Sequence, residues 1–181
     1  MKRALVLASI IIVLLASAHV RAQETPRVGG VLKVATVGEP PTLDIQMSTT
    51  VITYEIMWHV FESLFTYDPA FNPIPLLAES HEVGDGGLRH TITLRRGVRF
   101  HHGKEMTAAD VVPSIKRWGQ VATLGRILWK SIENIEAKDP YTVVLHLKQP
   151  SASLVYGLAE PAAMIYPREV VEAAGDGPIK D

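Results

Sequence analysis

The stretch that decides the fold is PLLAESHEVGDGGLRHTITLRRGVRFHHGKEMTAADVVPSIKRW, residues 75–118. Its first half places Gly84-Asp85-Gly86-Gly87 between two extended runs. In the second run, residues 90–95, His, Ile and Leu alternate with Thr, Thr and Arg. Alternation on both sides of a glycine-rich turn predicts a β-hairpin. The glycines are not read as a phosphate loop, because neither GxGxxG nor GxxxxGK[ST] occurs.

The second half of this stretch predicts a strand that turns into a helix. Phe100 ends the strand and Gly103 marks a tight turn. Thr107 and Asp110 have the spacing of a capping box, in which each residue satisfies an open backbone group of the first turn. The carboxylate of Asp110 also favours the positive end of the helix dipole. A helix is therefore expected from Ala108 to about Trp118, kinked or shortened by Pro113.

His101 and His102 in this stretch raise the alternative of a metal site. Adjacent residues on a strand point to opposite faces, so the two rings are not expected to bind one ion. His81-Glu82 begins an HExxH pattern, but Gly84 and Asp85 occupy its later positions. We therefore predict no metal site and no cofactor, and we expect both histidines to be solvated turn residues.

The rest of the chain alternates strand and helix signals. VLKVATV, residues 31–37, predicts a strand buried on both faces. Residues 52–64 carry apolar side chains at helical spacing, and a second helix is expected at about 124–132. Residues 132–147 predict another hairpin, which turns at Asp139-Pro140. A short helix is expected over residues 167–174, with Pro167 suited to its first turn and Gly175 just past its end.

The N-terminus predicts export. Residues 1–22 have a positive start, an apolar run of signal-peptide length and a small-residue ending, so we expect cleavage after Ala22, with Ala18 as second choice. The chain contains no cysteine, which excludes disulfides and thiolate metal sites. With 18 basic and 19 acidic residues, its charge gives no case for nucleic-acid binding. A soluble periplasmic protein fits best.

Catalytic patterns are not found in the sequence. A serine hydrolase of the nucleophile-elbow type needs GxSxG, which does not occur. Ser63, Ser114 and Ser131 lie in or beside apolar periodic runs, so structural roles are expected for them. Trp58 and Trp118 stand at spacings typical of a core, although a tryptophan can also stack on a ligand. The prediction is a protein that is not an enzyme.

The order of these motifs resembles family 5 of the solute-binding proteins of ABC transporters, which bind peptides, dipeptides and nickel. The resemblance is carried by Leu-Ala-Glu-Ser at 77–80, LRRGVRF at 94–100, Gly103 and the Thr-Ala-Ala-Asp-Val-Val helix start at 107–112. It extends to GGVLKVATVGEPPTLDIQ at 29–46 and to residues 135–155, which contain most of the second hairpin and the segment directly after it. The sequence departs from the family's pattern at His81, His102 and Pro113.

The resemblance implies an α/β fold of the periplasmic-binding-protein type (type II, cluster C). Family members are roughly three times as long, so the chain is expected to be an N-terminal fragment. By this comparison, residues 1–22 are the signal peptide and 23–56 begin lobe I. Residues 57–166 would form the small appended α+β domain with its hairpins and helices, and 167–181 would return to lobe I.

The implied function is that of a periplasmic receptor, without catalysis, for an ABC import system. Its expected partners are a peptide or other small solute and the inner-membrane permease with its ATPase subunits, and a monomer is expected. Met47, Ser48, Thr49 and Thr50 are the candidate ligand-binding residues, although a simple helix cap explains this loop equally well. The rival classes are a small secreted hydrolase and a self-sufficient interaction domain.

Overall fold

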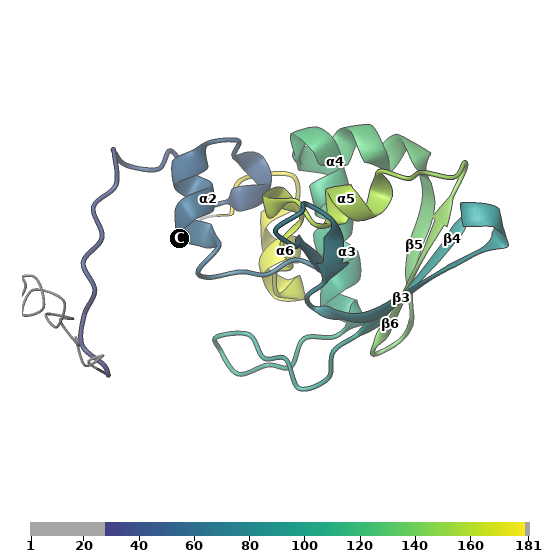
Figure 1. The fold of residues 1–181 in the computed structure, drawn as a ribbon, viewed down its shortest axis with the longest axis horizontal. Helices are drawn as coiled ribbons and strands as arrows, with labels where there is room; N and C mark the ends of the chain where they lie inside the picture. The colour runs from purple at the N-terminus through teal and green to yellow at the C-terminus, as the bar shows by residue number, and fades with distance from the viewer. Residues whose placement is uncertain (1–27, 180–181) are drawn as a thin grey trace, which may run out of the picture. The chain divides into compact units, whose positions relative to one another are not determined.

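The largest feature is a four-stranded antiparallel sheet with the strand order β3-β4-β6-β5 (Figure 1). It is seen in a computed structural model that describes residues 28–179. Strands β3 (Ala78–Gly84) and β4 (Arg89–Leu94) form the first hairpin, and β5 (Ile132–Asp139) and β6 (Thr142–Leu147) form the second. Both predicted hairpins are therefore confirmed, and β4 joins them by pairing with β6.

The turn of the first hairpin explains its glycines. Residues Asp85–Gly87 form a short 3-10 turn, η2, in which Asp85, Gly86 and Gly87 all have positive φ, at 52°, 65° and 94°. Glycine adopts this region without steric cost, whereas Asp85 does so less easily. Arg89 contributes across the turn, since its Nε donates to Asp85 Oδ2 at 2.8 Å.

Helix α3 (Ala108–Val121) packs against β5 and β6 and closes the main core. Val111, Ile115 and Trp118 on its inner side are fully buried, and the predicted alternation in β4 is confirmed, because His90, Ile92 and Leu94 are the buried positions. The apolar side chains of the sheet and of α3 form one continuous cluster. Burial of this cluster is the main force that holds the sheet and the helix together.

Pro113 does not shorten the helix as the sequence predicts. α3 continues through Pro113 to Val121, beyond the expected end at Trp118. A proline in the sixth helical position leaves unpaired only the carbonyl four residues earlier, which belongs to Ala109. Ala109 is exposed, so water can satisfy this carbonyl. The predicted capping box of Thr107 and Asp110 is present at the helix start.

The remaining elements are short. Helix α2 ends sooner than predicted, at Met57, and the second predicted helix ends before Ile132, which opens β5. α6 ends as predicted, at Gly175 with a φ of 54°, but Pro167 is its N-cap residue and the helix begins at Arg168. The bounds are η1 (Ile45–Met47), α2 (Val51–Met57), β1 (Phe65–Tyr67), β2 (Pro73–Pro75), α4 (Thr123–Leu128), η3 (Trp129–Ser131), α5 (Leu154–Leu158), η4 (Pro161–Ala163) and α6 (Arg168–Ala174).

The strand predicted at residues 31–37 is wrong for the structure described here. These residues form no regular element, and Val31, Leu32 and Val34 are 88%, 86% and 75% exposed. A strand needs a neighbouring strand to satisfy its backbone N–H and C=O groups. Among residues 28–179, no segment pairs with 31–37, so the β-branched composition alone does not produce a strand.

A second, smaller apolar cluster combines both ends of the unit that begins at Thr36. It contains Ile45 and Met57 from the first part and Met164, Tyr166 and Val171 from the last. The predicted domain limits at 56 and 166 stay a prediction. The signal peptide at 1–22 lies outside the described residues. Every helix within residues 28–179 is too short or too polar to traverse a bilayer.

Candidate ligand-binding site

The loop predicted to face ligand lies between η1 and α2 and is held by its own hydrogen bonds. Ser48 Oγ accepts the backbone N–H of Thr50 at 3.2 Å, and the hydroxyl of Tyr54 donates to the carbonyl of Ser48 at 2.8 Å. Thr50 is the N-cap residue of α2, but its side chain makes no bond to the helix backbone. The helix cap expected in this loop is therefore made by Ser48, which bonds to the backbone of the N-cap residue Thr50 and so stabilises the start of α2.

The same loop borders a cavity of about 260 Å³. Met47, Ser48 and Thr49 line it, whereas Thr50 does not and instead shares hydroxyl contacts with Ser48 and Thr53. The other lining residues come from η1, α2, the junction of α3 and α4, and the segment around η4: Gln46, Tyr54, Val121, Thr123, Leu124, Ile127, Glu160 and Ala162. The predicted ligand role of residues 47–50 remains a prediction.

A buried ion pair holds the residues that immediately precede this loop. Arg117 of α3 and Asp44 are exposed by only 2% and 0% of their side-chain areas, and Arg117 Nη2 lies 2.6 Å from Asp44 Oδ2. Arg117 also donates to Gln46 Oε1 and to the carbonyls of Gly175 and Gly177. Asp44 in turn accepts the backbone N–H groups of Gln46 and Ile179. The cavity wall is thus attached to α3 and to the segment after α6.

Arg117 is the last of three buried polar residues on one side of α3. Asp110, Ser114 and Arg117 follow one another at helical spacing, and all three are at most 2% exposed. Ser114 exchanges hydrogen bonds with both backbone groups of Tyr166, at 3.0 Å each. The sequence pattern did not predict this buried polar stripe. Its spacing was a signal, but polar residues at that spacing are usually found on the solvent side of a helix.

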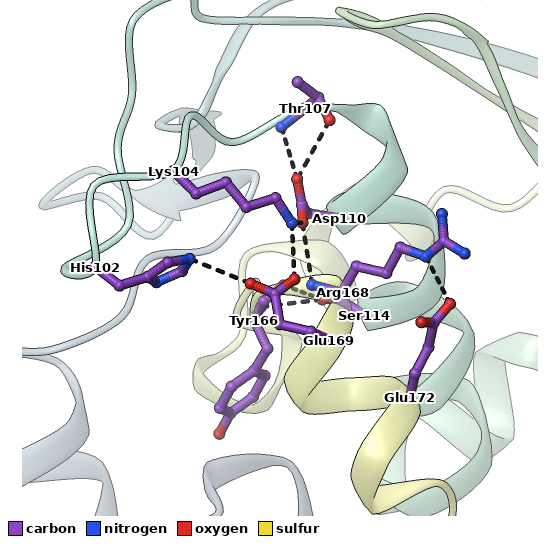
Figure 2. A network of polar contacts seen from close by, with 9 residues as sticks. All are labelled: His102, Lys104, Thr107, Asp110, Ser114, Tyr166, Arg168, Glu169 and Glu172. Atoms are coloured by element: carbon purple, nitrogen blue, oxygen red, sulfur yellow. Dashed lines mark hydrogen bonds and ion pairs between the residues drawn. The ribbon is translucent and has the colours of Figure 1, made fainter.

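Asp110 is the centre of a second polar network, which joins the start of α3 to α6 (Figure 2). Its carboxylate accepts from Lys104 Nζ at 2.6 Å and from the backbone N–H groups of Thr107 and Arg168 at 3.0 Å each. Burial alone would raise the pKa of Asp110, but the ammonium and the two N–H groups outweigh it and hold the pKa below its usual value. Lys104 also reaches Glu169 of α6 at 2.8 Å.

The two histidines of the decisive stretch go to separate partners. His101 Nε2 lies 3.1 Å from the carbonyl of Val60, and His102 Nε2 lies 3.1 Å from Glu169 Oε1. Both rings are attached to neighbouring segments in addition to being exposed, so the expectation of purely solvated turn residues is incomplete. Across residues 28–179, no three His, Asp or Glu side chains gather as a metal site would require.

The tryptophans divide between core and surface. Trp118 is fully buried, as predicted, whereas Trp58 is 55% exposed, so its predicted core position is wrong. Trp58 is the C-cap residue of α2, directly after its last residue, Met57. Trp118 donates its indole N–H to Glu160 Oε1 at 3.0 Å, which connects the core directly to a cavity-lining carboxylate.

Comparison with protein families gives one match over most of the described unit. Residues 72–180 match the model of the bacterial extracellular solute-binding proteins, family 5 Middle. The match begins before β2 and runs past the end of α6. It therefore includes both hairpins, the decisive stretch and most of the cavity-lining residues.

Individual relatives agree with the family model. A probable peptide ABC transporter periplasmic-binding protein, y4tO of Sinorhizobium fredii, is 37% identical over 130 residues, which are 67% of this chain and 24% of that protein. The glutathione-binding protein GsiB of Salmonella choleraesuis is 36% identical over 138 residues, 75% of this chain and 27% of its own. The chain thus spans about a quarter of the length of these curated relatives.

Solved structures show the same fold. AgaA from Agrobacterium tumefaciens R10, solved in complex with agropinic acid, superposes with a TM-score of 0.70 and is 32% identical. The superposition covers 79% of this chain and 29% of AgaA. The mixed α/β arrangement is accordingly that of a part of a periplasmic binding protein, as the sequence predicts.

Proposed function

Because the chain belongs to family 5 of the bacterial extracellular solute-binding proteins, we propose that it serves as the solute-recognising component of an ABC import system for peptides. The family is one of transport-associated binding proteins, and two of its relatives named above are a probable peptide binder and a glutathione binder. Glutathione is itself a tripeptide. A peptide is therefore the solute class with the most support.

The observation that carries the proposal is the cavity beside residues 47–49. The residues just before the loop are held by the buried Asp44–Arg117 pair, and the loop itself is held by the hydrogen bonds of Ser48. Backbone groups at the loop and the hydroxyl of Thr49 offer contacts to a peptide backbone, while Leu124 and Ile127 offer apolar ones. Recognition through backbone groups would tolerate many peptide sequences.

The predicted division of the chain is part of the proposal. Residues 23–56 would begin lobe I, 57–166 would form the appended domain and 167–181 would return to lobe I. The small cluster around Ile45 and Tyr166 supports this, since it packs the first and last parts together. Given that this chain matches only about a quarter of each relative's length, it would supply one wall of a cleft that closes on ligand by a shift between two states.

The rival proposal of a secreted hydrolase has less support. The hydroxyls of Ser63, Ser114 and Ser131 each donate to a backbone carbonyl, which occupies them structurally. We also propose a periplasmic location after cleavage at Ala22, a monomeric state and a membrane permease as partner. Mass spectrometry of the exported chain checks the cleavage, and a mature N-terminus at Met1 would contradict it.

Calorimetric titration with di-, tri- and tetrapeptides, glutathione included, tests the function. We expect at least one peptide to bind and to raise the melting temperature. Thr49→Trp should abolish binding by filling the cavity, whereas Ala152→Trp, at an exposed position outside it, should not. Absence of binding by every peptide, or unchanged binding in Thr49→Trp, would contradict the proposal.

A further inference from the structure

A second cavity, of about 290 Å³, lies between the segment that follows α2 and the loop that joins β4 to α3. It shares no lining residue with the cavity beside Met47–Thr49. Its volume is at the lower end of the range for small-molecule sites, which begins at roughly 300 Å³. The space is therefore separate from the one used in the proposed function, and it suits a small ligand.

The walls of this second cavity are joined by hydrogen bonds. His101 Nε2 lies 3.1 Å from the carbonyl oxygen of Val60, so the loop is bonded directly to the segment after α2. Because a carbonyl only accepts, Nε2 carries the hydrogen of this bond. The backbone N–H of Ile165 donates to the carbonyl of Glu62 at 2.9 Å and holds the same segment from another side. A ligand that enters walls already joined in this way has little chain to order.

Much of the lining is apolar or aromatic. Leu77, Met106 and Ile165 line the cavity and are buried. Phe100 of the loop is half-buried, whereas Trp58 on the opposite segment is 55% exposed. An aromatic ring in the cavity would cover part of this exposed indole through a stacked or edge contact. A ligand of that kind would give Trp58 the apolar partner that the core does not provide.

Arg99 brings a permanent positive charge to the lining. Its Nη1 donates to the carbonyl of Gly103 at 2.7 Å, and no carboxylate of residues 28–179 forms an ion pair with it. Glu105, on the same loop, instead accepts the N–H of Gly97 and the hydroxyl of Tyr141. The guanidinium therefore keeps N–H donors for a ligand, and a carboxylate is the group that matches their planar fork.

Glu62 is the carboxylate in the lining, and by itself it would favour a cation. It is exposed and forms no ion pair with Arg99, so water solvates its charge. The imidazoles of His59 and His101 also line the cavity, and they supply N–H donors and, when protonated, positive charge. Donor groups thus outnumber the one anionic group, which favours an anionic ligand.

We propose that this second cavity binds a small aromatic carboxylate, with its carboxylate on Arg99 and its ring against Trp58. The site is additional to the peptide cavity, and the inference does not rest on the proposed function. Because the guanidinium is exposed, its charged hydrogen bonds should increase the affinity by about tenfold, at the low end for such bonds.

Three probes with a phenyl ring on a three-carbon chain test the proposal: phenylpropionate, phenylpropanol and phenylpropylamine. They differ in being anionic, neutral and cationic at pH 7. In calorimetric titration of the full chain, we expect phenylpropionate to bind with a Kd of about 1 mM or tighter. It should bind about tenfold more tightly than either of the other two.

Four variants locate the binding. Arg99→Gln should weaken phenylpropionate about tenfold and remove its preference over phenylpropanol. Arg96→Gln, an equal charge change at an exposed residue of the same loop outside the lining, should leave both unchanged. Thr49→Trp, which fills the peptide cavity, should also bind phenylpropionate normally. Trp58→Ala should weaken all three probes, because each loses the same ring contact.

The opposite outcomes overturn the proposal. Phenylpropylamine binding as tightly as phenylpropionate would show that Glu62, and not Arg99, directs the ligand. An equal loss in Arg96→Gln and Arg99→Gln would reduce the effect to general attraction by a basic loop, and a loss in Thr49→Trp would place the probe in the peptide cavity. Absence of phenylpropionate binding contradicts the site outright. If Arg99→Gln does not fold, the three probes on the unchanged chain and on Thr49→Trp decide the matter.

Discussion

Asp44 and Arg117 are 73 positions apart in the chain, yet their side chains meet at 2.6 Å in an interior that excludes water. The guanidinium makes five hydrogen bonds, to Asp44 twice and to Gln46, Gly175 and Gly177, which matches its full number of N–H donors. A buried ion pair contributes to stability only when such partners replace the lost water. Here they do, and one side chain joins three segments of the chain.

Loss of Arg117 should therefore destabilise the fold strongly. Arg117→Ala leaves the carboxylate of Asp44 buried without its cation, and we expect a loss of about 3–5 kcal/mol in the free energy of unfolding. Urea denaturation at pH 7 measures it. Arg126→Ala, on the exposed side of α4, is the matched control and should change stability by less than about 0.5 kcal/mol.

A double substitution tests whether the loss of stability in Arg117→Ala comes from the unpaired charge of Asp44 or from the lost packing of the Arg117 side chain. In Asp44→Asn with Arg117→Met, both charges are absent, so we expect the double variant to be more stable than Arg117→Ala. A double variant as unstable as the single one would show that the cost arises from lost packing and backbone contacts and not from an unpaired charge.

Asp110 should make the free energy of unfolding depend on pH in the acidic range. Its folded-state pKa lies below the ordinary 3.8, so its contribution is complete above pH 3.8 and disappears as the pH falls through the lower folded value. We expect Asp110→Asn to lose about 1–3 kcal/mol at pH 7. Its deficit relative to the unchanged chain should shrink below pH 3.8, as followed by thermal unfolding at several pH values. Asp176→Asn, an exposed control, should show neither effect, and a deficit constant with pH would contradict the assignment.

His81 and His90 should also couple folding to pH, in a different range. Their rings stack with centroids 5.1 Å apart, and His81 Nε2 lies 2.9 Å from His90 Nδ1. Burial lowers the pKa of both, and for His81 the neighbouring His90 adds to the effect. The unfolded chain then binds more protons below pH 6.5, so stability is complete above pH 6.5 and falls as the pH decreases towards the folded values.

The His81→Phe substitution checks this coupling. A phenyl ring can keep the edge contact with Phe65 but cannot titrate. We expect the drop in melting temperature between about pH 7.5 and about pH 5.5 to be smaller by a few degrees than in the unchanged chain. His59→Phe, at an exposed histidine, serves as the control. A drop of equal size in both variants would exclude the His81–His90 pair as its cause.

Gly125 should resist replacement although it lies in a helix. Glycine normally costs a helix about 1 kcal/mol relative to alanine, so Gly125→Ala would be expected to stabilise α4. A Cβ at Gly125, however, would collide with the backbone carbonyl of Trp118, which cannot move aside. We expect a net loss of about 1–3 kcal/mol by urea denaturation. Gly38→Ala, where a Cβ meets open space, should be close to neutral.

The elements that sequence predicts well are those whose signal is local. Both hairpins are predicted by apolar and polar residues that alternate along a strand, as in residues 90–95, and by turn residues a few positions away. The start of α3 is likewise predicted by Thr107 and Asp110, which form a capping box within the first helical turn. The ligand role of Met47–Thr50, which rests on resemblance to a family, stays a prediction; Met47, Ser48 and Thr49 line a cavity and Thr50 does not.

The elements that the sequence predicts poorly depend on residues far away in the chain. Residues 31–37 have the composition of a strand, but a strand is defined by its neighbour, and none of the described segments pairs with it. The buried stripe on α3 could not be distinguished from a solvated face, because what buries Arg117 is Asp44 and the glycines near 175, which no local pattern connects. Glu160 was missed for the same reason: its partner, Trp118, lies 42 positions away.

The hydrogen bond between Ile179 N–H and Asp44 Oδ2, 3.0 Å long, brings the entry and the exit of this segment to one point. A folded module whose two connections leave from the same place can be joined to a host domain through a single junction, without stretching either chain. The two ends of residues 44–179 therefore lie side by side, and both chain connections leave this segment at one place.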